Sequence, residues 1–318
     1  MNTPKASRVL ILGGMGFIGQ HLTLACRSAG MIVRVADMFL PAPEVRQDGV
    51  EYIDGDYKDS EFLQGILEEV DSVVHLVHDT MILNQECNMD VEFERNVRPA
   101  MHLMDMCCAK KIKKFLFVSS GGTVYGHRLN HQPIVESSTT KPISLYGTSK
   151  LIIENIGFLY NIQKNLPFIV ARPGNAYGPG QKPFRGQGFV ATAFASALQG
   201  EVLNIFGDGS VVRDYIHVRD LADALVAILR FGKLGEAYNV GTSKGVALHT
   251  LLNEYITPIL EDDGYSLQCQ YTPPRGVDVP YNVLSNDKLR RDTSFAPSIE
   301  LHDGLRETLM WLKNFNLV

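Results

Sequence analysis

The chain has 318 residues, of which 45% are apolar and 20% charged, and its formal net charge is -5. These values are typical of a water-soluble globular enzyme and give no reason to expect nucleic acid or a membrane surface as a partner. The five cysteines, at 26, 87, 107, 108 and 269, show no CxxC spacing, and no apolar run approaches the ~18 residues of a bilayer span. We therefore expect a cytoplasmic protein without a disulfide framework, a zinc site or a membrane helix.

Residues 8–20, RVLILGGMGFIGQ, have the order strand, tight turn, helix, with glycines at 13, 16 and 19. Glycine permits a sharp turn and a close approach to a pyrophosphate, and the first turn of a helix offers free N–H groups. A second strand over 32–36 ends at Asp37, where a dinucleotide fold places the carboxylate that holds a ribose diol. This carboxylate would repel a 2'-phosphate and no arginine follows it, so the pattern predicts NAD binding rather than NADP binding.

Further elements follow in an order typical of a parallel sheet. Asp56 and Tyr57 come just after a short strand at 50–53, and the Asp56 carboxylate could bind an adenine amino group or cap the helix predicted over 60–69. The next predicted elements are a strand at 71–77, a helix over 90–110 that contains Asn96, a strand at 114–119, a helix from about 144 and a strand at 168–172.

The alternation is less regular beyond Pro173. We expect helices over 189–199, 220–230, 248–260 and 301–314, a strand at 237–240 and a turn at 207–210. The fold class is therefore predicted as α/β, a Rossmann-type doubly wound parallel sheet with a smaller C-terminal lobe. Residues 1–175 would form the NAD-binding domain, with 214–243 returning to it, and 176–318 the substrate lobe.

An acid/base pair is predicted from YGTSK, residues 146–150. Tyr146 and Lys150 share one helical face, and the strand before them runs into the hydroxyl-rich segment SSGGTVYG at 119–126. A lysine ammonium and a positive nicotinamide both stabilise phenolate, which would lower the tyrosine pKa from about 10 and let Tyr146 exchange a proton with a substrate hydroxyl. The alternative for this spacing is an ordinary amphipathic helix with a surface lysine.

Together these motifs resemble the extended short-chain dehydrogenase/reductase family, and within it the NAD-dependent nucleotide-sugar epimerases and dehydratases, with UDP-hexose 4-epimerases as the most similar type. GGMGFIG at 13–19 resembles the family's GGxGFIG loop, and YGTSK its YxxSK motif. RPGNAYGPGQ at 172–181 and LNIFGDGSVVRDYIHVRDLADAL at 203–225 are similar to two further family segments, and RGVD at 275–278 keeps an Arg-x-x-Asp spacing.

The resemblance implies roles for particular residues. The implied catalytic residues are Tyr146 and Lys150 with Thr123 or Ser120. The implied cofactor-binding residues are Gly13, Gly16, Phe17, Ile18, Gly19, Asp37, Asp56, Tyr57, Asn96, Ser119, Tyr146 and Lys150. The implied substrate-binding residues are Asn175, Val190, Asn204, Phe206, Arg213, Arg275, Asp278 and Asn282, with the two arginines on the diphosphate.

The implied reaction is a transient oxidation of a UDP-sugar. Tyr146 removes the proton of the C4 hydroxyl, hydride passes to NAD, and the resulting 4-keto sugar swings and takes the hydride back on its other face. Family members also dimerise through a four-helix bundle, which here would use residues 92–110 and 145–163 of each subunit in a homodimer. No metal is expected, because His127 and His131 lie in a proline-containing loop.

Three positions depart from the family pattern. Gly121 stands where a serine or threonine is usual, so Thr123, favoured narrowly, or Ser120 must supply that hydroxyl. His78 stands where a small residue is usual and either reshapes the pocket or ends a strand. Gly122 and Thr123 replace the Asp-Glu pair of sugar-nucleotide 4,6-dehydratases, which disfavours dehydration.

Substrate choice depends on the residue seven positions after Arg275, which is Asn282. A small polar residue there would leave room for an N-acetyl group, so UDP-N-acetylhexosamines are expected as substrates beside or instead of plain UDP-hexoses. The alternatives are a UDP-uronate 4-epimerase, with Arg185 as a candidate for binding the carboxylate, and a non-catalytic NAD-binding sensor. The retained Tyr146 and Lys150 argue against the sensor, and Gly121 argues weakly for it.

Overall fold

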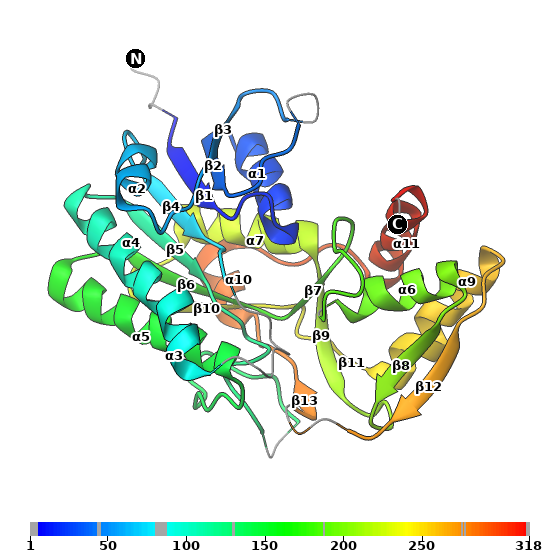
Figure 1. Ribbon diagram of the computed structural model, residues 1–318. Helices are drawn as coiled ribbons and strands as arrows, with labels where there is room; N and C mark the ends of the chain where they lie inside the picture. Colours follow the sequence, from blue (N-terminus) through cyan, green and yellow to red (C-terminus); the bar gives the residue numbers. More distant parts are fainter. Residues whose placement is uncertain are drawn as a thin grey trace.

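The computed structural model describes residues 6–42, 46–79, 88–128, 131–186, 188–274, 276 and 278–315. Within these ranges seven strands form a parallel sheet in the order β10-β6-β5-β4-β1-β2-β3 (Figure 1). The strands are β1 (Arg8–Leu12), β2 (Ile32–Asp37), β3 (Val50–Asp54), β4 (Ser72–His75), β5 (Lys114–Val118), β6 (Phe168–Pro173) and β10 (Ala237–Val240). The strand order reverses between β1 and β4, and ligands bind outside the carboxyl ends of the strands at such a switch point. The predicted fold class is confirmed.

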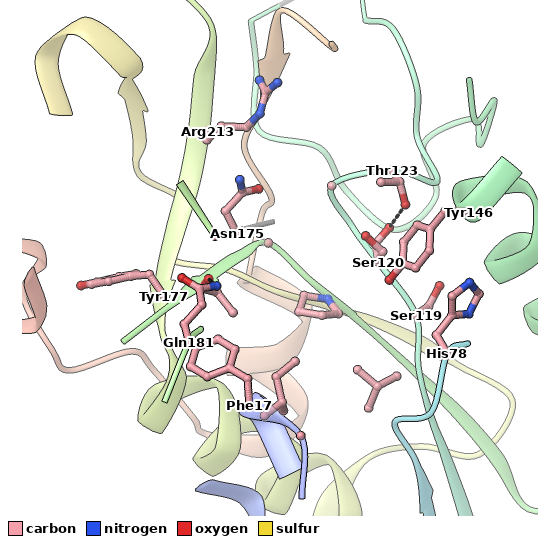
Figure 2. A pocket seen from close by; sticks show the side chains of 18 of the residues that line it. Phe17, His78, Ser119, Ser120, Thr123, Tyr146, Asn175, Tyr177, Gln181 and Arg213 are labelled. Atoms are coloured by element: carbon pink, nitrogen blue, oxygen red, sulfur yellow. Dashed lines mark hydrogen bonds between the residues drawn. The ribbon is translucent and has the colours of Figure 1, made fainter. Parts of the chain in front are cut away.

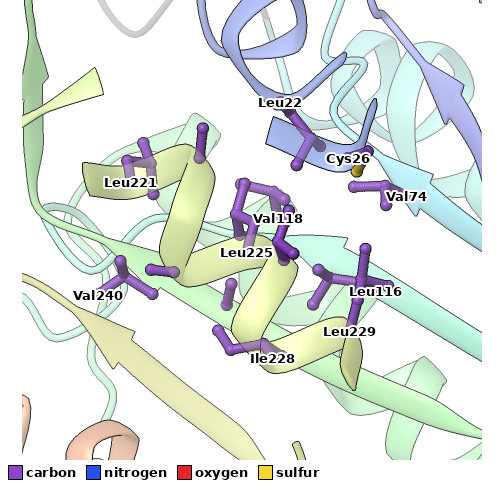
Figure 3. Close-up of a cluster of buried hydrophobic side chains, with 14 of the residues drawn as sticks. Leu22, Cys26, Val74, Leu116, Val118, Leu221, Leu225, Ile228, Leu229 and Val240 are labelled. Carbon is purple, nitrogen blue, oxygen red and sulfur yellow. The ribbon is translucent and has the colours of Figure 1, made fainter. Parts of the chain in front are cut away.

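Helices cover both faces of this sheet. On one face α1 (Phe17–Ser28), α7 (Val218–Phe231) and α10 (Asp287–Thr293) contribute to one apolar core. Figure 3 shows α7 directing Leu221, Leu225 and Ile228 toward the sheet, the three- and four-residue spacing that a buried helical stripe requires. On the other face α2 (Ser60–Ile66), α4 (Arg98–Ala109) and α5 (Leu145–Lys164) build a second core. Residues 218–240 thus return to the sheet as α7 and β10.

The remaining elements form a smaller lobe beside the carboxyl ends of the strands (Figure 1). Its strands are β7 (Asn175–Tyr177), β8 (Val202–Phe206), β9 (Val212–His217), β11 (Gly245–Ala247), β12 (Gln268–Thr272) and β13 (Tyr281–Asn282). Its helices are α6 (Phe189–Gln199), α8 (Leu248–Thr250), α9 (Thr257–Asp262) and α11 (Leu301–Asn314), with the π-helical turn η3 (Leu251–Ile256) between α8 and α9. A third apolar core lies between α6, α11 and the helices around η3.

Two predicted helices are interrupted by π-helical turns. The helix expected over 90–110 consists of α3 (Met89–Glu92), the turn η2 (Phe93–Val97) and α4, and the helix expected over 248–260 is divided in the same way by η3. Each turn is followed by a helix with proline in its first positions, Pro99 and Pro258. Proline lacks the N–H group that a continuous helix uses, so the hydrogen-bond pattern changes before it.

Among the described helices, none combines the length and the apolar character that crossing a bilayer requires.

Candidate functional site

A cavity of about 500 Å³ lies between the carboxyl ends of the sheet strands and the smaller lobe. Figure 2 shows Tyr146, Ser120, Thr123 and His78 on one side of it, and Asn175 and Arg213 on the other. The predicted site residues that line this cavity are Gly13, Gly16, Phe17, Ile18, Gly19, Ser119, Ser120, Thr123, Tyr146, Lys150, Asn175, Val190, Arg213 and Asp278. Segments far apart in the sequence therefore meet at one place.

The glycine loop is packed so tightly that side chains would break it. A Cβ at residue 19 would lie 2.4 Å from the Gly13 carbonyl oxygen, and the φ of Gly13 is +79°. Gly16 occupies the N-cap of α1, so no side chain covers the first turn of that helix from this position. The result is a short, open turn in front of a helix N-terminus, which is the arrangement that binds phosphate groups.

The predicted adenosine-binding residues lie next to this loop rather than in the cavity lining. Asp37 ends β2, and one of its carboxylate oxygens accepts a hydrogen bond from Met15 N at 3.0 Å. Asp56 accepts from Lys58 N at 3.0 Å, and Asp59, not Asp56, caps α2 through Phe62 N at 2.8 Å. The N-cap alternative for Asp56 is therefore wrong, because the N-cap position lies three residues after it.

Tyr57 and Asn96 also lie behind the cavity wall. The Tyr57 side chain is buried in the apolar core against His75, with ring centroids 5.3 Å apart. The Asn96 side-chain oxygen accepts from Asp79 N at 2.7 Å, which holds the segment after β4 in place. The cofactor contacts expected of these two residues remain predictions.

The acid/base pair is presented by the first turns of α5. The Ser144 hydroxyl caps this helix by accepting from Gly147 N at 3.1 Å. Lys150 is buried, donates to the Val118 carbonyl oxygen at 3.0 Å, and places its ammonium 5.7 Å from the Tyr146 ring centroid. The Tyr146 and Ser120 side chains line the same side of the cavity (Figure 2).

Burial dominates the titration of both groups. Burial lowers the pKa of Lys150 to about 7, and the carboxylates of Glu154 and Glu92 oppose this effect by raising it. It raises the pKa of Tyr146 to about 12, with the Ser120 hydrogen bond opposing and Glu92 adding to the rise. The protein by itself thus favours the phenol, and the lowered tyrosine pKa expected from the sequence requires a further positive charge beside the ring.

Gly121 faces away from the cavity. A Cβ at this position would meet Leu284 Cδ1 at 2.5 Å and the Arg172 carbonyl oxygen at 2.9 Å, and Gly121 itself is not part of the lining. A side chain at 121 would need the packing around it to shift. Ser120 and Thr123 do line the cavity, and the Thr123 hydroxyl points to the Ser120 carbonyl oxygen at 3.5 Å (Figure 2). Of the two hydroxyls, that of Ser120 opposes the rise in the pKa of Tyr146.

On the smaller lobe, Arg213 lies on β9 and donates to the Val279 carbonyl oxygen at 2.6 Å. Asn204 and Phe206 lie on β8 and are outside the cavity lining. Asn282 is buried on β13, and its amide donates to the Gly121 carbonyl oxygen at 2.9 Å. Arg275 lies outside the described residues. The substrate contacts expected of these residues remain predictions.

Several lining residues were not predicted, among them Tyr177, Gln181 and Tyr215. Tyr177 and Gln181 belong to the YGPGQ segment, so their motif was recognised although their place in the cavity was not. His78 had a signal in the sequence, because it departs from the family pattern. Its ring lies edge to face against the Tyr146 ring, with centroids 4.5 Å apart. The reading of His78 as a pocket-shaping residue is therefore the one that the geometry favours.

Comparisons with known proteins agree with this geometry. A family model described as the NAD dependent epimerase/dehydratase family matches residues 9–241. A UDP-glucose 4-epimerase from Mycolicibacterium smegmatis is 29% identical over 315 residues, covering 96% of this chain and 99% of that protein.

Solved structures with the same fold include a UDP-glucose 4-epimerase from Thermotoga maritima with UDP-glucose. It is 29% identical, has a TM-score of 0.89, and the match covers 96% of this chain and 99% of that one. A UDP-N-acetylglucosamine 4-epimerase from Methanobrevibacter ruminantium, in complex with UDP-N-acetylmuramic acid, is 27% identical with a TM-score of 0.87, covering 98% of this chain and 99% of that one.

Proposed function

The chain belongs to the NAD dependent epimerase/dehydratase family, and from this we propose that it is an NAD-dependent 4-epimerase of a UDP-sugar. The observation that carries the proposal is the meeting of Tyr146, Ser120 and Lys150 in one cavity with the glycine loop. Tyr146, the group that would transfer the proton, thus lies where the reactive end of the cofactor would lie.

The cavity fits NAD. The glycine loop leaves room for a pyrophosphate that any Cβ at residue 19 would close. Ser119 also lines the cavity, and its buried hydroxyl has no hydrogen-bond partner among the described residues, so a polar group of a ligand would satisfy it. NAD, when bound, accepts a hydride from C4 of the sugar and returns it to the opposite face.

In the proposed reaction Tyr146 takes the proton of the C4 hydroxyl and later returns it. Ser120, on the same side of the cavity, would donate a hydrogen bond to the phenol oxygen, and the Lys150 ammonium would stabilise the phenolate. Asn175 and Arg213, on the other side of the cavity, would hold the diphosphate, together with Arg275. Because the hydride and the proton both return to the sugar, the reaction needs no net oxidant and NAD can stay bound.

Two observations support 4-epimerisation of hexoses and N-acetylhexosamines over other reactions of the family. Gly122 and Thr123 line the cavity where dehydratases would carry an acid pair to expel the 6-hydroxyl. Asn282 keeps its side chain inside the protein against Gly121, so it does not fill the space that an acetamido group would need. The likeness to a UDP-N-acetylglucosamine 4-epimerase is consistent with this substrate class.

The test is a panel of UDP-sugars incubated with the purified protein without added NAD, with C4 epimers followed by NMR. We expect interconversion of UDP-glucose with UDP-galactose and of UDP-N-acetylglucosamine with UDP-N-acetylgalactosamine. Turnover of UDP-glucose alone would contradict the N-acetylhexosamine part. Turnover of UDP-glucuronate alone would replace the proposal with a uronate epimerase.

Ser120→Ala is expected to lower kcat about 10²-fold, the usual effect of removing one donor from a reacting oxygen. Thr123→Val is the matched control and should change kcat by less than about 5-fold, because the Thr123 hydroxyl points to a backbone carbonyl. Steady-state kinetics on UDP-glucose measures both. If the larger loss falls on Thr123→Val, that residue supplies the hydroxyl, which is the choice narrowly favoured from the sequence.

We also propose a homodimer formed through α4 and α5. These helices cover the same face of the sheet, and α5 leaves Leu159 47% exposed and Ile162 77% exposed. Apolar side chains at such positions would be buried if two copies paired their helices.

A further inference from the structure

Behind the acid/base pair lies a buried carboxylate, that of Glu92. The residue ends α3 and is 1% exposed, and a π-helical turn, a feature that concentrates at functional sites, begins at the next residue. Its Oε1 atom lies 2.8 Å from His78 Nε2 and accepts from Ser149 Oγ at 2.6 Å and Asn96 Nδ2 at 3.2 Å. None of the predicted site residues is this carboxylate.

Two of these partners touch Tyr146. His78 packs its ring edge to face against the Tyr146 ring, and Ser149 Oγ lies 2.9 Å from the Tyr146 carbonyl oxygen. Ser149 is also the residue before Lys150. Glu92 therefore holds the two contacts that fix the tyrosine ring and its backbone.

The carboxylate also differs in its surroundings from Glu154, the other acid that acts on Lys150. Glu154 is paired with Arg172, whose guanidinium donates to both carboxylate oxygens of Glu154 at 3.1 Å. The donors described for Glu92 bring no positive charge: Ser149 and Asn96 are neutral groups, and burial lowers the pKa of His78 to about 4. Both carboxylates favour the Lys150 ammonium, and Glu154 has the larger effect.

We propose that Glu92 is a positioning residue, and this proposal rests on the proposed function. Glu92 fixes His78 and Ser149 against Tyr146, and it favours the charged form of Lys150 when bound ligands exclude water from the site. Other charged groups near the pair come from the neighbouring strands. His75 at the end of β4 is buried and uncharged, Asp79 after β4 is paired with Lys58 at 2.7 Å, and Arg172 on β6 is paired with Glu154. Among these groups, Glu92 is the acid that both contacts His78 and Ser149 and favours the Lys150 ammonium.

The test compares pH profiles of kcat for three variants on UDP-glucose. Glu92→Gln removes a charge that favours the Lys150 ammonium. In this variant Lys150 should therefore lose its proton at a lower pH than in the parent protein. We expect the alkaline limb to move about one pH unit toward acid, the size of shift that a nearby charge gives, with a fall of about tenfold in kcat on that limb. KM should change little, because Glu92 does not line the cavity.

Glu92→Asp keeps the charge, so the alkaline limb of its pH profile should lie where that of the parent lies. Its kcat should be lower, because the shorter side chain does not reach Ser149 as well. Glu94→Gln is the matched control, since Glu94 is an exposed acid in the same helical segment and is paired with Arg98. It should leave the profile unchanged.

A Glu92→Gln profile lowered uniformly with no shift of the limb would show a merely structural role and overturn the proposal. If Glu92→Gln fails to fold, Glu92→Asp decides: the parental limb supports the proposal and a shifted limb overturns it. Failure of the proposed function is distinguished by the parent protein, which would then show no epimerisation at any pH.

Discussion

Tyr146→Phe is expected to lower kcat for UDP-sugar interconversion about 10²- to 10⁴-fold, the range that a positioned proton-transfer group contributes. The substitution removes one oxygen, that of the Tyr146 hydroxyl, which would act as the base and belongs to a residue that lines the cavity. The ring remains to pack against His78, so the fold should persist. Single-turnover and steady-state rates on UDP-glucose measure the loss.

Tyr160→Phe is the matched control, because it makes the same change on the same helix. The Tyr160 side chain contacts Lys164 near the end of α5, away from the cavity, so the variant should keep the parental kcat. A Tyr146→Phe protein that turns over UDP-sugars at the parental rate would remove the tyrosine from the mechanism. If the parent itself shows no turnover, the chain is a cofactor-binding sensor that has kept the fold.

The sheet could be predicted from the sequence because its signals are local. Most strands of the sheet contain a short apolar run, such as the one before Gly13, and the boundaries found differ from the predicted ones by one or two residues in most cases. The strands of the smaller lobe were not predicted. Strand β12, QCQYT, is polar and mostly exposed, and β8 alternates between exposed and buried residues, so neither carries a continuous apolar pattern.

Part of the site could be predicted from the sequence, namely the residues that lie on one helix at a spacing that brings their side chains together. Tyr146 and Lys150 are four residues apart on one helix, and the structure places both in the cavity. The choice between Ser120 and Thr123 could not be made in this way, because it depends on how the loop after β5 turns. That turn is set by Leu284 and the Arg172 carbonyl, which lie far away in the sequence and pack against Gly121.

The carboxylate behind Tyr146 was missed for a related reason. In the sequence Glu92 is one of several acids in a polar helical segment, and a solvated surface position is the ordinary expectation for it. It becomes buried because η2 and α4 pack on α5 and bring Ser149 to it. Such pairings between distant elements have no signature in spacing or composition.

Arg172→Leu is expected to lower the free energy of unfolding by about 3–5 kcal/mol, the cost of leaving a buried charge without its partner. Arg172 is the second-last residue of β6. Its guanidinium lies 2.5 Å from Glu154 Oε2 and 2.9 Å from the Tyr125 hydroxyl, and the Arg172 and Glu154 side chains are 7% and 1% exposed. Burial alone would lower the pKa of Arg172, but the Glu154 carboxylate raises it, so the guanidinium stays charged throughout the working range. Urea denaturation at neutral pH measures the change.

The double variant Arg172→Leu/Glu154→Leu tests whether the cost comes from the orphaned carboxylate rather than from lost packing. Because both charges are then absent, we expect it to recover a large part of the stability that Arg172→Leu loses, as replacement of buried ion pairs by apolar residues often does. If the double variant is as unstable as the sum of the single changes, the pair is not the source of the loss. The stability would then come from the Tyr125 hydrogen bond and from packing at the end of β6, where Gly121 and the cavity wall begin.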